Sequence, residues 1–227
     1  MTTAELLAKV KKLHSSTIAD VLDSRGILGW LDCKIQRLAG QEGIVFGEAY
    51  TVAWQFNRKS QDIKASVSPT WDQVKDFLVP DVKNGSGKIY VAGAGSLLTD
   101  MALAGGLSCT HFEMIGFEGV ILGGAVRDAH VLRQLKIPVM ATNFIPADTQ
   151  GCYRVVEVGT SCTINNLLVH TGDWIFADES GCVIIPKDLL GLVLHEGLEI
   201  EVAEENIMSQ LKRGENLFTI IEKAGRI

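Results

Sequence analysis

The stretch KIYVAGAGSLLTDMALAGGLSCTHFEMIGFEGVILGGAVRDAHVLRQLKIPVMA, which runs from Lys88 to Ala141, decides the fold. Short apolar runs that suit buried strands alternate in it with longer runs that suit helices. The predicted elements are a strand (Lys88–Ala92), a helix (about Gly105–Ile115), a strand (Gly119–Leu122), a helix (Asp128–Leu135) and a strand (Ile137–Ala141). This βαβαβ order predicts parallel strands joined by right-handed crossovers.

The segments on either side add helices and antiparallel strands. Upstream, the predicted elements are a helix (Ala4–Leu13), a helix opened by a capping box at Thr17–Asp20 and closed by Gly26, a strand or hairpin (Gly43–Gln55) and a helix (Thr70–Leu78). Downstream, alternating segments separated by turns predict antiparallel hairpins over Cys152–Pro186. Lys187–Ile227 is predicted to be mostly helical, with a strongly charged face from Glu199 to Lys212.

The composition is that of a globular protein. A chain of 227 residues that is 47% hydrophobic supports one core, so we predict a single domain over residues 1–227. The net charge of -6 argues against a nucleic-acid-binding surface, because such surfaces need clustered cations. The sequence shows neither a signal peptide nor a run of roughly 20 apolar residues, so we expect a cytoplasmic protein without a membrane anchor.

The five cysteines show no paired spacing of the kind that disulfide frameworks or zinc sites use. We interpret them as reduced thiols that mostly pack in the core. Cys109 lies close to the start of a predicted helix, where a thiol is readily activated. It is therefore either a nucleophile or, as the alternative, a core side chain.

Two glycine-rich corners stand out in the central stretch. Gly105-Gly106-Leu107-Ser108 opens a helix and leaves backbone amides free to meet an anion. The second corner, Gly123–Asp128, follows the next strand. In a parallel sheet such corners meet at one edge, which is where ligands bind. We therefore expect the two corners to form one site.

Arg127 and Asp128 carry the candidate chemistry of the second corner. Arg127 suits a carboxylate, which it can bind through two hydrogen bonds, and Asp128 suits a hard divalent cation. Together they would grip an α-oxo acid while the metal polarises its carbonyl and stabilises an enolate. The alternative is structural: Asp128 supports the first turn of a helix, and Arg127 forms a surface salt bridge.

Three runs of the sequence resemble the RraA-like family. They are GVILGGAVRD (Gly119–Asp128), LKIPV (Leu135–Val139) and the hairpin Thr171–Pro186. The resemblance covers nearly the whole chain, from Thr17–Leu22 to the final helix. This family includes class II pyruvate aldolases that act on 4-hydroxy-4-methyl-2-oxoglutarate, with an oxaloacetate decarboxylase side activity, and regulators of ribonuclease E activity.

The resemblance implies a compact α/β/β/α sandwich with a central βαβαβ unit and a C-terminal helix, assembled as a homotrimer or hexamer with sites at subunit interfaces. It also implies residue roles. In the family's aldolases an acidic residue precedes an Arg-Asp pair by twenty intervening residues. The Arg binds the pyruvyl carboxylate, the Asp coordinates Mg²⁺ or Mn²⁺, and the acid contacts a metal-bound water. Arg127 and Asp128 match this pattern.

The acidic residue of that pattern is missing, because Gly106 stands at its position. Gly123 likewise stands where the family has Asp before Gly-Ala-Val-Arg-Asp. Asp100 is interpreted as a helix cap or as an acid that reaches inward. Glu205, or its neighbour Glu204, matches a glutamate that the aldolases supply from the C-terminal helix of a neighbouring subunit. A solvated helix face is the alternative interpretation of these glutamates.

His130 and His111 lie near the two corners in the sequence. His130 is two residues beyond Asp128, so it is either a base or an exposed bystander. His111, on the helix that follows Gly106, is interpreted as a core or interface residue.

Three functions stay open from the sequence. The first is a divalent-metal-dependent lyase, an aldolase or decarboxylase, that acts on a small α-oxo acid with Arg127, Asp128 and Glu205 as catalytic residues and Asp128 as the metal ligand. The second is a non-enzymatic RraA-like regulatory binding protein, which the glycine at position 106 favours. The third is a family member with altered chemistry on a larger substrate, for which Gly106 makes room.

Overall fold

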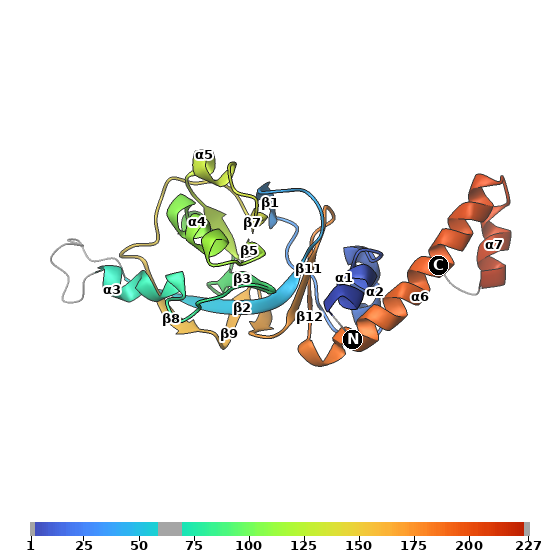
Figure 1. The fold of residues 1–227 in the computed structure, drawn as a ribbon, viewed down its shortest axis with the longest axis horizontal. Helices are drawn as coiled ribbons and strands as arrows, with labels where there is room; N and C mark the ends of the chain where they lie inside the picture. Colours follow the sequence, from blue (N-terminus) through green and yellow to red (C-terminus); the bar gives the residue numbers. More distant parts are fainter. Residues whose placement is uncertain (1–2, 59–69, 225–227) are drawn as a thin grey trace. The chain divides into compact units, whose positions relative to one another are not determined.

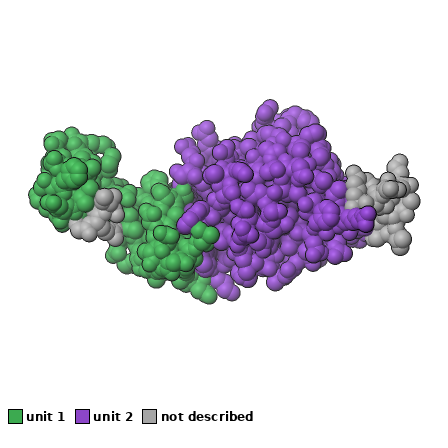
Figure 2. Space-filling model, turned by 180° about the vertical axis from the view of Figure 1, so that it is seen from behind, with its two compact units in different colours: residues 1–28, 188–227 green, residues 29–187 purple. Residues whose placement is uncertain are grey.

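The computed structural model describes residues 3–58 and 70–224 of the chain. The chain divides into two compact units, one of residues 1–28 and 188–227 and one of residues 29–187 (Figures 1 and 2). We call the first the helical unit and the second the sheet unit. The prediction of one domain over residues 1–227 stays a prediction.

The centre of the sheet unit follows the predicted βαβαβ order. Strands β3 (Lys88–Gly93), β5 (Gly119–Leu122) and β7 (Val139–Ala141) are neighbours in one parallel arrangement. Helices α4 (Gly106–Met114) and α5 (Ala129–Leu132) lie between them along the chain (Figure 1). The mixed α/β class, with a central βαβαβ unit and a C-terminal helix, is therefore confirmed.

Other strands extend this sheet on both sides. β1 (Gln36–Ala39) pairs antiparallel with β7, and the long β2 (Val45–Phe56) pairs parallel with β3. The first half of β2 also pairs with β11 (Trp174–Ala177), which forms a hairpin with β12 (Cys182–Ile185). The second half of β2 pairs with β8 (Tyr153–Val158). The hairpin of β11 and β12, together with β8, thus extends the sheet around a parallel centre.

Side chains on the two faces of β3 pack into two separate hydrophobic cores. Tyr90 belongs to the core beneath α4, where its ring stacks on Phe112 with centroids 4.1 Å apart. Val91 belongs to the opposite core. That core is closed by the antiparallel pair β9 (Ser161–Ile164) and β10 (Leu167–His170). Successive side chains of a strand point to opposite faces of the sheet, so a strand that is buried on both faces contributes to a core on each side.

A small second sheet was not predicted from the sequence. β4 (Leu98–Ala104) and β6 (Gly124–Val126) pair in parallel with an irregular register. The sequence predicts a loop and a turn here, because β6 has only three residues and β4 carries polar residues in mid-strand. β4 ends directly before the first glycine-rich corner, and β6 lies within the second.

The helical unit consists of α1 (Thr3–Val10), α2 (Ser15–Asp23), α6 (Leu190–Lys212) and α7 (Leu217–Ala224). The C-terminal segment is helical as predicted up to Ala224, and residues 225–227 lie outside the described residues. In the described part of the chain, none of the helices is both long and apolar enough to cross a membrane.

Glu201 of α6 is the buried polar centre of the helical unit. Its Oε1 accepts hydrogen bonds from the Thr17 hydroxyl at 2.6 Å and the His14 amide at 3.2 Å. The ring Nδ1 of His14 lies 2.9 Å from the same oxygen. The predicted capping box at Thr17 is therefore wrong. The helix α2 begins at Ser15 with His14 as its N-cap, and the Thr17 hydroxyl is committed to Glu201 inside the helix.

Two other elements differ from their predicted form or bounds, and each has a local reason. The helix predicted over Thr70–Leu78 is an α-helix, α3, over Thr70–Val74 that continues as a 3-10 turn, η1, over Lys75–Leu78. It ends at Val79, whose backbone is left-handed with φ 48. Strand β7 begins only after Pro138, which has no amide hydrogen to donate to a sheet.

Replacing Glu201 with alanine is expected to lower the free energy of unfolding by roughly 1–3 kcal/mol, because the buried Thr17 hydroxyl loses its acceptor. Urea denaturation followed by circular dichroism measures the change. Glu204→Ala, at an exposed position of the same helix, is the matched control and should stay within about 0.5 kcal/mol of wild type. Equal stability of Glu201→Ala and wild type would contradict the structural role of this carboxylate.

Candidate functional site

Two strand ends bring the glycine-rich corners side by side. Ala104, the last residue of β4, is in register with Val126, the last residue of β6. The Arg127 amide donates a hydrogen bond to the Ala104 carbonyl at 3.1 Å. Gly105 and Arg127 follow these residues, so the start of the first corner and the end of the second lie at neighbouring points of the fold.

Asp128 turns its carboxylate toward the first corner. Its backbone is left-handed (φ 62, ψ 48), a conformation that Asp tolerates better than most residues. Its Oδ2 accepts a hydrogen bond from the Gly106 amide at 2.9 Å. Asp128 occupies the N-cap of the short α5, but its side chain makes no capping bond there. The structural alternative for Asp128, support of the first turn of the following helix, stays open, but its carboxylate hydrogen-bonds the start of α4.

The first turn of α4 presents one amide that the fold does not use. The Gly105 amide donates to Ser108 Oγ at 2.9 Å, and the Gly106 amide donates to Asp128. Within the described residues, the amide of Leu107 has no hydrogen-bond partner. Of the four amides expected to meet an anion, this one stays available at the positive end of the helix dipole.

Val131 fills the space into which a side chain at position 106 would project. A Cβ at Gly106 would lie 2.8 Å from the Val131 Cβ and 3.0 Å from both of its methyl carbons. Position 123 is closed in the same way, since a Cβ at Gly123 would lie 3.0 Å from two carbons of Ile164. Neighbouring β-branched side chains therefore leave no room for a larger residue at the two positions where glycine departs from the aldolase pattern.

Arg127 is flanked by two carboxylates. Its Nη2 lies 3.2 Å from Oδ2 of Asp148, and its Nε lies 3.9 Å from Oδ2 of Asp128. The Arg127 side chain is 37% exposed, so part of the guanidinium is open to a ligand. Asp148 escaped the sequence analysis because it lies in a loop without a motif and meets Arg127 only through the fold. Arg127 therefore does form the surface ion pair considered for it, and part of its guanidinium is still open to a ligand.

The surroundings of Asp128 fit a cation that keeps most of its water. The described residues contain no group of three or more His, Cys, Asp or Glu side chains that would hold a metal ion. Among those residues, Oδ1 of Asp128 has no hydrogen-bond partner, and the side chain is 42% exposed. Mg²⁺ is commonly held by one or two carboxylates together with waters and ligand oxygens. Asp128 therefore fits Mg²⁺ or Mn²⁺ shared with a chelating ligand.

The other acidic candidates lie elsewhere. Glu204 and Glu205 are exposed on α6 and belong to the helical unit. Asp100 lies inside strand β4 and does not cap α4, whose N-cap is Gly105. The capping role predicted for Asp100 is therefore wrong, because the loop assumed around it is a strand.

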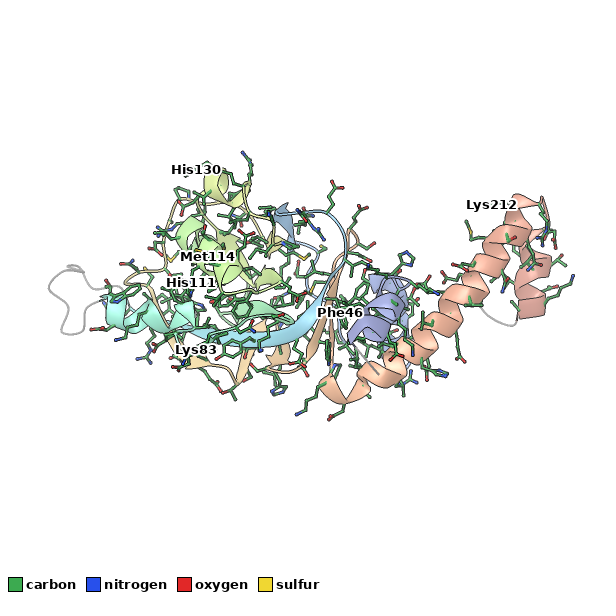
Figure 3. All side chains as sticks on the ribbon, in the orientation of Figure 1. Phe46, Lys83, His111, Met114, His130 and Lys212 are labelled. Carbon is green, nitrogen blue, oxygen red and sulfur yellow. The ribbon has the colours of Figure 1, made fainter. Side chains whose placement is uncertain are left out.

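The two histidines differ in their surroundings. His111 on α4 is half-buried, and its Nε2 lies 3.1 Å from the Leu78 carbonyl, as suits a structural residue. His130 is exposed on α5 (Figure 3). Neither histidine contacts Arg127 or Asp128 among the described interactions.

Cys109 is a core side chain rather than a nucleophile. It is a fully buried residue of α4. Burial raises the pKa of the Cys109 thiol to about 12; the Asp128 carboxylate also raises it, while a hydrogen bond with Ser108 lowers it. The thiol is therefore protonated and inaccessible near neutral pH, which corresponds to the packing alternative.

The chain is similar to a known family and to several known proteins. The family described as RraA-like, Aldolase/RraA, matches residues 15–184. Protein DlpA of Legionella pneumophila is 30% identical over 218 residues, which cover 95% of this chain and 33% of DlpA. The chain thus spans about a third of the length of that relative.

Two further comparisons concern activity and fold. The "Putative 4-hydroxy-4-methyl-2-oxoglutarate aldolase" of Vibrio vulnificus is 30% identical over 152 residues, which cover 66% of this chain and 82% of the relative. The structure of Streptomyces coelicolor RraAS2, "an unusual member of the RNase ES inhibitor RraA protein family", superposes with a TM-score of 0.71 at 22% identity. It covers 93% of this chain and 100% of that chain, which shows a shared fold.

Gly106→Ala is expected to lower the free energy of unfolding by roughly 1–3 kcal/mol, because the added Cβ collides with Val131. In an unobstructed helix the same change would favour folding. Denaturant unfolding of Gly106→Ala, Val131→Ala and the double variant gives a cycle in which the second substitution relieves part of the loss caused by the first. Strictly additive effects would argue that the two side chains do not meet.

Cys33 should be the fast-reacting thiol of the native protein, because it is exposed while the other four cysteines are buried. Burial also raises the pKa values of Cys162 and Cys182 to about 12. A chromogenic disulfide reagent at mildly alkaline pH counts the accessible thiols before and after denaturation. Cys33→Ser should remove the fast phase; a fast phase that survives this substitution would show that a buried thiol opens to solvent.

Proposed function

Since the chain belongs to the RraA-like family (Aldolase/RraA), we propose that it is a divalent-metal-dependent carbon–carbon lyase that acts on a small α-oxo acid. The observation that carries the proposal is the contact between the two corners. There the Arg127 guanidinium, the Asp128 carboxylate and the start of α4 with its unused Leu107 amide lie together. The aldolase name of the Vibrio vulnificus relative supports the reaction class.

Each group would act on a different part of the ligand. Arg127 binds the carboxylate, because a planar guanidinium pairs with two oxygens at once. The Leu107 amide would donate to oxygen that gains negative charge as the carbon–carbon bond breaks. Asp128 would hold Mg²⁺ or Mn²⁺, and a cation bound there supplies Lewis acidity toward the oxo group.

Gly106 favours decarboxylation over aldol cleavage. Aldol cleavage needs a base that removes the hydroxyl proton as the carbon–carbon bond breaks. Decarboxylation of oxaloacetate needs no such base: CO₂ leaves, the electron pair stays on the pyruvate enolate, and a proton from water completes the product. Position 106 carries no acid, and Val131 leaves no room for one. Decarboxylation is therefore the reaction that these residues support best.

A second copy of the chain would extend the chemistry to aldol cleavage. Glu205 is exposed on α6 and is the candidate acid that resembles the subunit-bridging glutamate of the aldolases. We infer a homotrimer or hexamer in which Glu205 of one subunit transfers protons in the site of its neighbour. Arg127 and Asp128 stay the binding groups in that assembly.

A regulatory binding protein is the second candidate function. The specific observation in its favour is the missing acid at Gly106, which Val131 seals. A protein of this kind would recover a ribonuclease from native lysate and would convert no oxo acid. A lyase would do the reverse, so a pulldown combined with an activity assay separates the two functions.

We expect Mg²⁺- or Mn²⁺-dependent pyruvate release from oxaloacetate, at a higher rate than from 4-hydroxy-4-methyl-2-oxoglutarate. Arg127→Ala and Asp128→Asn should each lower kcat/KM by roughly 100-fold or more, because each removes a group that faces developing or fixed charge. A coupled assay that detects pyruvate measures both substrates.

Arg133→Ala is the matched control, since Arg133 is an exposed arginine at the end of α5 whose guanidinium lies over the Phe144 ring. It should keep activity within about twofold of wild type, as expected for a surface change. Unchanged activity in both Arg127→Ala and Asp128→Asn would refute the assignment of the site.

A further inference from the structure

Asp148 places a fixed negative charge against the group that would bind the substrate carboxylate. Its Oδ2 lies 3.2 Å from Nη2 of Arg127, and the Asp148 side chain is 29% exposed. Asp128 approaches the same guanidinium from its Nε side at 3.9 Å. One cation therefore lies between two carboxylates, and the group carries a net negative charge.

Asp148 is held in place independently of Arg127. Its Oδ1 accepts hydrogen bonds from the Thr149 amide at 2.7 Å and from the Thr149 hydroxyl at 3.3 Å. Thr149 is only 3% exposed. The adjoining backbone is tied to β4, because the Ala102 amide donates to the Ala147 carbonyl at 2.9 Å. The carboxylate is thus anchored by one oxygen while the other meets the arginine.

This arrangement opposes the binding of a simple anion. A carboxylate within about 6 Å of Asp148 loses roughly tenfold in affinity at an effective dielectric constant of about 40. A divalent cation on Asp128 would cancel the combined charge of the two aspartates and remove that opposition. A ligand that chelates the cation would gain further, since one of its oxygens then meets the metal and its carboxylate meets Arg127.

We propose that Asp148 makes anion binding at Arg127 conditional on a divalent cation at Asp128, and so restricts the site to chelating oxo acids and diacids. Asp148 is a positioning and specificity residue in this account, because it acts through Arg127. The inference rests on the proposed function for the location of the cation. It goes beyond that function by naming the residue that rejects non-chelating carboxylates.

Isothermal titration calorimetry with oxalate and with acetate, each with and without Mn²⁺, tests the inference on the full chain. Formation of the oxalate–Mn²⁺ complex in solution is subtracted. For wild type, Mn²⁺ should strengthen oxalate binding by roughly tenfold or more, a typical coupling between sites, and acetate should not bind measurably. In Asp148→Asn, oxalate binding without metal should tighten by roughly tenfold, and the coupling should fall by the same factor.

Two variants serve as controls. Asp148→Glu keeps the charge and should keep most of the coupling. Asp100→Asn removes a charge from β4, the strand that the Asp148 segment pairs with, and should leave the coupling unchanged. Circular dichroism melts establish that each variant is folded. Asn retains an oxygen acceptor for the Thr149 amide, so Asp148→Asn is expected to fold.

The outcomes separate this inference from the proposed function. Coupling that is equal in wild type and Asp148→Asn overturns the inference, even if oxaloacetate is converted. Coupled binding that depends on Asp148 in a protein without lyase activity overturns the function and supports the inference. Failure of wild type to bind oxalate in the presence of Mn²⁺ overturns both.

Discussion

The hydrogen bond from the Gly106 amide to Oδ2 of Asp128 joins the two corners on which the candidate site depends. It requires the start of α4 to approach the Arg127–Asp128 turn so closely that side chains are excluded. A Cβ at Gly105 would lie 2.7 Å from the same oxygen, and one at Gly106 would strike Val131. The left-handed backbone of Asp128 is the other half of this contact, because it directs the carboxylate toward α4. Asp128, one of the proposed ligand-binding residues, therefore also takes part in the packing of the two corners.

The close packing of Val131 against Gly106 explains how the site differs from the aldolase pattern. An acid at position 106 and a valine at position 131 compete for one volume, so the glycine is part of a packed pair. In the proposed lyase the site would keep an arginine for the carboxylate and an aspartate for the cation, but it would have no base at position 106. Chemistry that needs only charge stabilisation stays accessible to these residues. Chemistry that needs proton removal would require an acid from another copy of the chain.

The sequence was sufficient for elements whose signal is local. The strand Gly119–Leu122 and the helix starting near Gly105 follow from an apolar run and from paired glycines, and both lie where they were predicted. The short strand Gly124–Val126 was missed because its pairing partner, β4, lies more than one element away. Thr17 was misassigned for a similar reason, since its hydroxyl is used by a glutamate from the distant helix α6.

The difference between local signals and contacts between distant segments also applies to the candidate site. The adjacency of the two corners follows from the topology of a parallel sheet, so Arg127 and Asp128 were predictable from strand order. Asp148 was not, because its ion pair depends on the path of a loop that docks on β4. The reason for Gly106 was also hidden, since only the fold shows Val131 against it.

We propose that the two corners form one site for a carboxylate and a divalent cation. A crystal structure of the protein with Mn²⁺ and oxalate, with anomalous data for manganese, would locate both ligands. We expect an anomalous peak roughly 2 Å from a carboxylate oxygen of Asp128, with oxalate bridging that ion and the Arg127 guanidinium. Manganese bound elsewhere, or oxalate that does not contact Arg127, would contradict it.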